Sequence, residues 1–212
     1  MATLDLHEQE QVDALKAWWA ENGRWVIIAL ILAAGSFAAV RGWQSWQGGK
    51  EQQAATLYAD VIQQVGSDDP KRIGDAAQAV VDKFGSTTYA AQAQLLAAQA
   101  SIQAKDDAKA TTQLQWVIEH AAEGGLQNVA RLKLASLLLD EKKYDEALKQ
   151  LEAKHPTSFD SLYLDLKGDV LQAQGKKDEA RAAYQTAYDK TDEKNGYRNL
   201  IRMKLDALGG VK

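Results

Sequence analysis

The stretch that most constrains this chain is the uncharged run 25–40, WVIIALILAAGSFAAV, which lies between Arg24 and Arg41. The run also contains no Asn, Gln or Pro. As a helix it is slightly short for a hydrocarbon core of about 30 Å. The flanks supply the missing length, because arginine side chains snorkel and tryptophans favour the membrane interface. The flanking tryptophans are Trp18, Trp19, Trp25, Trp43 and Trp46. The sequence therefore predicts a single transmembrane helix with its interfacial flank over 25–46.

A buried core helix and a cleaved signal peptide are the two alternatives for this run. Ser36-Phe37-Ala38 provides a small-x-small cleavage site behind the apolar stretch. A signal peptide, however, begins with a short, positively charged segment. Residues 1–24 carry five acidic residues and only two basic ones. We therefore expect an uncleaved membrane anchor.

Residues 4–22 show the apolar spacing of an amphipathic helix among acidic side chains. The apolar positions are Val12, Leu15, Trp18 and Trp19. Asn22-Gly23 then predicts the end of this helix. Segment 1–24 is thus predicted to be an amphipathic tail that lies on the membrane surface, contacts a partner or simply orients the anchor.

Charge and composition argue against several classes of protein. The net charge is −4, of which the tail contributes −3, so the remaining 23 basic and 24 acidic residues nearly balance. Binding to nucleic acid requires a basic surface, which this balance does not favour. The chain has no cysteine, and its three histidines lie in separate segments without metal-ligand spacing. Phosphate-loop and nucleophile motifs are absent from the sequence, so we expect no catalytic residue, cofactor or metal and no enzyme activity.

The sequence beyond the anchor is a series of helical segments separated by short polar or glycine-containing breaks. The Gln-Gly-Gly-Lys at 47–50 is the first predicted break. The predicted helices are 51–65, 70–84, 88–104, 107–122, 127–141, 144–154, 160–174, 177–190 and 196–208. No period-two strand pattern competes with them, and the predicted fold class is all-α.

The helical segments contain an internal repeat, which becomes visible when 166–187 is aligned with 132–153 and the same frame is applied to 95–117. Each unit has a small residue on its first helix, an alanine twelve residues later and a large residue sixteen residues later. In chain order these are Ala98, Ala110 and Leu114, then Ala135, Ala147 and Leu151, then Gly168, Ala180 and Tyr184. This spacing resembles the tetratricopeptide repeat (TPR), in which small residues let two helices pack closely.

The match to the repeat is clearest over 160–190 and weakest over 51–84. The last segment, 196–208, has the character of a capping helix that covers the open face of the final repeat. We therefore predict a TPR-like α-solenoid over 51–212, and a nonrepetitive helical bundle is the alternative.

The whole chain resembles the YfgM family, the ancillary subunit of the bacterial SecYEG translocon. The resemblance is carried by EQEQVDALKAWWAENG at 8–23, the single anchor, GWQSWQ at 42–47 and the degenerate TPR array. It implies a bacterial inner-membrane protein with a cytoplasmic tail and a periplasmic TPR domain. It also implies association with SecYEG and the periplasmic chaperone PpiD, to assist secreted or outer-membrane protein chains after translocation. The flanking charges do not decide the orientation, because Lys16 and Arg24 balance Arg41 and Lys50. The alternative is a generic membrane-tethered TPR scaffold for another complex.

A TPR solenoid binds extended or helical peptides on a concave face lined by the first helix of each pair. Transferred to this register, the binding positions are Gln92, Leu95, Gln99, Ile102, Val129, Leu132, Ser136, Leu139, Leu162, Asp165, Asp169 and Gln172. The Lys/Asn clamp that some TPR proteins use for a peptide carboxylate is missing from these positions. Apolar side chains among amides suit hydrophobic segments of a partner chaperone or an unfolded client. Leu132 and Leu139 are alternatively core residues, because a shift of one residue moves a side chain from one helix face to another.

Overall fold

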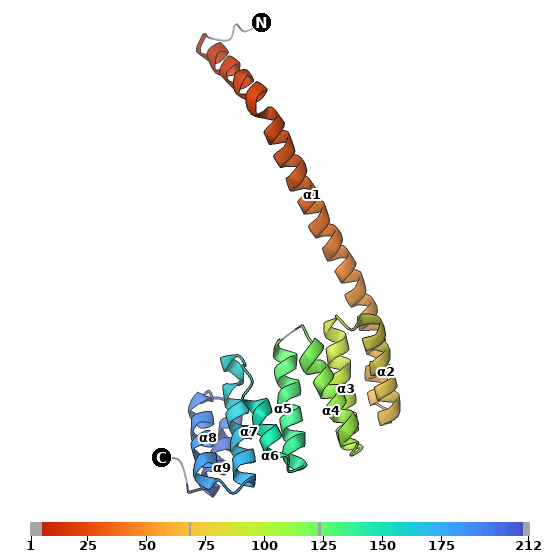
Figure 1. Cartoon of the computed structure of the whole chain (residues 1–212), viewed down its shortest axis with the longest axis vertical. Helices are drawn as coiled ribbons and strands as arrows, with labels where there is room; N and C mark the ends of the chain where they lie inside the picture. Colours follow the sequence, from red (N-terminus) through yellow and green to blue (C-terminus); the bar gives the residue numbers. More distant parts are fainter. Residues whose placement is uncertain (1–5, 68, 123, 210–212) are drawn as a thin grey trace. The chain divides into compact units, whose positions relative to one another are not determined.

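The computed structural model describes residues 6–67, 69–122 and 124–209, and every regular element in these ranges is helical (Figure 1). The all-α prediction is thereby confirmed. The chain divides into two compact units, Met1–Gly49 and Lys50–Lys212. The long helix α1 (Leu6–Val65) contributes residues to both units.

The apolar run of α1 has the properties of a membrane span. Among the described residues, it lies in the one helix that is long and apolar enough to cross a bilayer. Four of its large side chains are more than 60% exposed, namely Leu30, Ile31, Leu32 and Phe37. Exposed apolar side chains of this kind are what a helix presents to lipid, so the run is a candidate membrane span.

The two breaks predicted within this helix are wrong, because α1 is continuous through Asn22-Gly23 and through 47–50. Gly23 lies against the indole of Trp19, so a Cβ there would come within 3.1 Å of the ring. Asn22 remains helical and donates a hydrogen bond from Nδ2 to the carbonyl oxygen of Trp18, at 3.1 Å. Each glycine costs a helix only about 1 kcal/mol, which does not end it without a cap or a proline.

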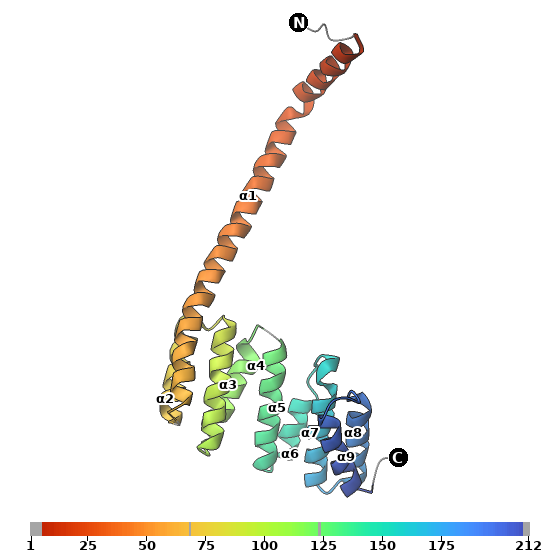
Figure 2. The same cartoon turned by 180° about the vertical axis from the view of Figure 1, so that it is seen from behind.

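Beyond α1, the helices of the second unit are α2 (Pro70–Phe84), α3 (Thr88–Gln103), α4 (Asp107–His120), α5 (Gly124–Asp140), α6 (Tyr144–Leu151), the short 3₁₀ helix η1 (Thr157–Phe159), α7 (Asp160–Ala173), α8 (Lys177–Lys190) and α9 (Tyr197–Ala207). Of these, α2 to α8 follow one another in sequence order, and α9 overlaps α7 and α8 in both views (Figures 1 and 2). The ends of α2 to α9 lie within three residues of the predicted ends.

Local chemistry explains where several of these helices begin. The carboxylate of Asp69 accepts hydrogen bonds from the backbone of Lys71 and Arg72 at the start of α2, and Pro70 occupies the first helical position. Thr87 and Asp106 cap α3 and α4 in the same way. These caps satisfy backbone N–H groups that have no partner within the helix.

The three turns within the helix pairs share one backbone conformation. Seven residues after the small residue of each repeat, Lys105, Lys142 and Gly175 have φ angles of 59°, 60° and 79°. A left-handed residue costs about 1–2 kcal/mol unless it is glycine. The position therefore belongs to the repeat, although only the last unit places a glycine there.

The side chains of the repeat positions are buried as the TPR register requires. Ala98, Ala110, Ala135, Ala147 and Ala180 are 0% exposed, and Gly168 is buried. Helix α3 contacts α5, and α5 contacts α7, so the first helices of successive pairs are neighbours. Helix α9 buries Ile201 and Leu205 beside α8, in the capping position that was predicted. The TPR-like fold is thus confirmed.

Candidate protein-binding surface

The predicted binding residues lie on α3, α5 and α7, the first helices of the three pairs, and we name these twelve positions the A-helix surface. Eleven of them are partly or fully exposed, and Asp165 is buried. Leu95, Leu132 and Leu139 are partly buried and also pack against the central core cluster. Each of these leucines therefore contributes to the core with one side and remains partly accessible with the other.

Residues from two repeats meet in a hollow between α3 and α5. Gln99, Ile102 and Ser136, all predicted, line a hollow of about 220 Å³ together with Lys133, Leu137 and Asp140. The ammonium of Lys133 donates a hydrogen bond to Oε1 of Gln99 at 2.7 Å and so links the two helices. We name this site the α3–α5 hollow.

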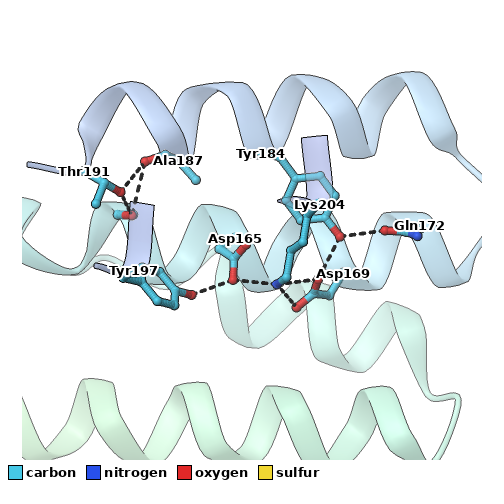
Figure 3. A network of polar contacts seen from close by, with 9 residues as sticks. Asp165, Asp169, Gln172, Tyr184, Ala187, Thr191, Tyr197 and Lys204 are labelled. Carbon is cyan, nitrogen blue, oxygen red and sulfur yellow. Dashed lines mark hydrogen bonds and ion pairs between the residues drawn. The ribbon is translucent and has the colours of Figure 1, made fainter. Parts of the chain in front are cut away.

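The end of the A-helix surface is occupied by the protein itself. Asp165 is only 3% exposed, and Nζ of Lys204 on α9 lies 2.7 Å from its Oδ2 and 2.8 Å from the carboxylate of Asp169 (Figure 3). The hydroxyl of Tyr197, also on α9, donates to the carboxylate of Asp165. The two predicted aspartates are therefore partners of the capping helix, and within α7 Leu162 and Gln172 remain exposed.

Two tyrosines complete this polar cluster, which we name the α7–α9 network. The hydroxyl of Tyr184 shares its proton between Oδ1 of Asp169 at 2.7 Å and Oε1 of Gln172 at 2.8 Å (Figure 3). Burial, followed by the bond to Asp169, raises the pKa of Tyr184 well above its usual value. Burial and the contact with Asp165 raise the pKa of Tyr197 in the same way. Both phenols are thus held in their neutral, proton-donating form.

The described residues contain no group of three His, Cys, Asp or Glu side chains placed to hold a metal ion. The chemistry of the A-helix surface is that of amides, apolar side chains and a few charges. Such a surface can contact another polypeptide.

Comparison with known proteins identifies the family. A family model described as a tetratricopeptide repeat-like domain matches residues 16–210. A protein of Neisseria gonorrhoeae named ancillary SecYEG translocon subunit is 32% identical over 204 residues, which cover 96% of this chain and 98% of the relative. A protein of the same name from Escherichia coli is 30% identical over 205 residues, with 95% and 97% covered. The chain belongs to the family of ancillary SecYEG translocon subunits.

Membership of the ancillary SecYEG translocon subunits confirms the family resemblance seen in the sequence. The relatives are named as subunits of a translocon and not as enzymes, in agreement with the prediction of a non-enzymatic chain. No solved structure matches this ancillary subunit.

Three charged residues that line or contact the A-helix surface were not predicted from the sequence, namely Lys133, Asp140 and Lys204. Lys133 and Asp140 lie three residues before and four residues after Ser136, so a helical wheel places both beside that predicted position. That spacing was the available signal for the hollow. The contribution of Lys204 had no comparable signal, because it lies on the capping helix, outside the repeat register.

Proposed function

We propose that this chain is an inner-membrane subunit of the SecYEG translocon whose TPR-like domain binds a partner chaperone, PpiD by resemblance, and assists exported chains after translocation. The observation that carries the proposal is the A-helix surface, on which predicted residues of α3 and α5 line a single hollow. The family and the candidate span in α1 support the membrane location.

The apolar character of the surface suits the proposed ligands. Ile102 and the accessible sides of Leu95 and Leu139 offer contacts to hydrophobic segments, while Gln92 and Gln99 offer hydrogen bonds to a backbone in any sequence context. A partner chaperone or an unfolded exported chain presents both kinds of group. The proposed binding therefore depends on the hydrophobic character of the segment and does not require one fixed sequence.

The proposed topology places the tail 1–24 in the cytoplasm, the span 25–46 in the inner membrane and the domain 51–212 in the periplasm. Because the chain has no cysteine, a single Ser158→Cys substitution on the exposed η1 gives a specific reporter. A maleimide that cannot cross the inner membrane should label this cysteine in intact cells with a permeabilised outer membrane. Labelling only after the inner membrane is broken would contradict the topology.

A substitution in the α3–α5 hollow tests the binding function directly. Ile102→Asp with Ser136→Trp places a charge and a bulky ring in the hollow and avoids the core contacts of Leu95. Recovery of the partner chaperone with the full-length chain, extracted in mild detergent, should fall at least severalfold. Helicity and membrane insertion should be unchanged.

The matched control is Leu200→Asp with Met203→Asp, which changes two exposed apolar residues of α9 away from the hollow. This control should recover the partner at the wild-type level. Wild-type recovery by the folded hollow variant would contradict the proposal. Recovery of a complex unrelated to the translocon would favour a generic membrane-tethered scaffold instead.

A further inference from the structure

The α3–α5 hollow and the α7–α9 network are built on the same repeat position. Gln99 and Asp169 both directly follow the small residue of their repeat. In each case a lysine two helices further along the chain, on α5 or on α9, contacts that residue. Lys133 on α5 lies 2.7 Å from Gln99, and Lys204 on α9 lies 2.8 Å from Asp169.

The two lysines differ in the charge that faces them. Lys204 is paired with the carboxylates of Asp165 and Asp169. The side chain of Lys133 is partly buried, and its one partner among the described residues is the uncharged amide oxygen of Gln99. A partly desolvated ammonium is much better satisfied by a carboxylate than by an amide. The first site therefore lacks the anion that the last site contains.

The space beside Lys133 is suited to a side chain rather than to a small molecule. Its volume of about 220 Å³ lies below the roughly 300–1,000 Å³ of small-molecule pockets. Ile102 provides an apolar wall next to the ammonium. Asp140 lies seven residues further along α5, about 10 Å away along the helix axis, so its charge lies at the other end of the hollow.

We infer that the α3–α5 hollow receives an acidic side chain of the bound polypeptide, whose carboxylate pairs with Lys133 while a neighbouring apolar side chain contacts Ile102. Within this protein the α7–α9 network shows the same pairing already formed. The inference rests on the proposed function and names the chemistry of the segment that the A-helix surface selects: hydrophobic, with an embedded Asp or Glu.

Three matched peptides test this selection on the full-length chain in nanodiscs of neutral lipid. Each is a fluorescein-labelled, C-terminally amidated 14-residue peptide of alternating leucine and serine, with a central pair of Glu, Gln or Lys. Amidation removes the terminal carboxylate, so that only the side chains differ in charge. At low salt the Glu peptide should bind about three- to tenfold more tightly than the Gln peptide, as measured by fluorescence anisotropy. Adding salt to about 0.5 M should narrow this ratio, since the Debye length falls to a few ångströms.

Substitution of the lysine should change the preference in a defined direction. Lys133→Gln should make the Glu and Gln peptides bind equally, and Lys133→Glu should favour the Lys peptide. Lys149→Glu, on the exposed side of α6, is the control and should preserve the wild-type order. Circular dichroism of each variant verifies that the helices are retained.

The possible results distinguish a failure of this inference from a failure of the proposed function. Equal binding of the Glu and Gln peptides to the wild type, or an unchanged order in Lys133→Glu, would overturn the acidic selection and leave peptide binding intact. Absence of binding by all three peptides would count against the A-helix surface as a peptide site, and the inference would fall with it.

Discussion

The first aligned repeat (α3 and α4) and the last one (α7 and α8) have different residues at the same TPR positions. Helix α3 buries six alanines, so α3 and its neighbours approach through small side chains along much of their length. Helix α7 has a single point of close approach, Gly168, and a Cβ there would come within 2.4 Å of the ring of Tyr184. The last repeat adds the α7–α9 network, whereas among the described residues α3 and α5 are joined by one side-chain hydrogen bond, from Lys133 to Gln99.

This difference shows that a repeat position specifies a distance between helices rather than a residue type. Alanines meet the distance with little volume and no polar side-chain atoms, so they need no hydrogen-bond partner. A glycine beneath a buried tyrosine meets the same distance with a large ring that must also satisfy its hydroxyl. The last repeat therefore depends on fewer and more specific contacts, and substitutions there should have the larger effects.

The largest expected effect follows from removing the cation of the α7–α9 network. Lys204→Met leaves Asp165 buried with Tyr197 as a partner, while its Oδ1 already has no hydrogen-bond partner among the described residues. We expect a loss of about 2–3 kcal/mol in the free energy of unfolding, below the usual 3–5 because the lysine is 23% exposed. Lys133→Met, whose partner is a neutral amide, should cost about 0.5 kcal/mol. Chemical denaturation of the full-length chain in detergent measures both, and equal losses would contradict the comparison.

Alkaline pH should weaken the same network. A tyrosine whose folded pKa is raised contributes stability that is fully present below its unfolded pKa of about 10 and is lost as pH rises toward the folded value. Tyr184 and Tyr197 both fall in this class. Each tyrosine should lower the free energy of unfolding by at most about 1.4 kcal/mol per pH unit above pH 10. Tyr197→Phe should reduce the loss between pH 10 and 11, and a loss identical to that of the wild type would remove Tyr197 from this explanation.

Two glycine substitutions compare the packing of the two regions. Gly168→Ala gains about 1 kcal/mol of helix propensity but forces a Cβ against the buried, hydrogen-bonded ring of Tyr184, for a net loss of about 1–2 kcal/mol. Gly74→Ala, in α2, meets Nζ of Lys109 at 2.8 Å, the mobile end of a long side chain. It should be neutral or stabilising by up to about 1 kcal/mol. The melting temperature, followed by circular dichroism, should fall for Gly168→Ala and stay the same or rise for Gly74→Ala. A stabilising Gly168→Ala would show that α7 and α8 are less closely packed than described.

The smallest expected effect concerns the shared left-handed turn. Lys142→Gly should stabilise the domain by about 1 kcal/mol, because glycine adopts a φ of 60° without strain. Gly175→Ala should destabilise it by a similar amount at its φ of 79°. Proteolysis in the two turns or denaturation of the full-length chain can detect both changes. Effects of the same sign would show that the two turns are not equivalent.

Most of the fold could be predicted from the sequence, because helix periodicity and the small-residue register are local signals. The positions Ala98, Ala135 and Gly168 were found by alignment alone and are buried. The left-handed turn was visible only at Gly175, since lysine at the same position gives no sign of a positive φ. The continuity of α1 through its glycines was missed, because a glycine signals a break but costs only about 1 kcal/mol.

The candidate site was predictable only in part. Gln99, Ile102 and Ser136, chosen from the repeat register, line one hollow, and their role in binding stays a prediction. Lys204, which pairs with both Asp165 and Asp169, lies on α9, more than thirty residues further along the chain, and such a contact depends on helix packing rather than periodicity. The register therefore predicted a surface, and the side-chain contacts show that its α7 end is occupied by α9.

The central claim is that the A-helix surface, and not another face of the domain, contacts the partner. A photo-crosslinking p-benzoylphenylalanine at Ser136, in the full-length chain within its own membrane, tests this claim most directly. The same group at Lys149, on the exposed side of α6, is the matched control. We expect a cross-link to the partner chaperone from position 136 and none from position 149. A cross-link from position 149 with none from position 136 would contradict the binding surface described above.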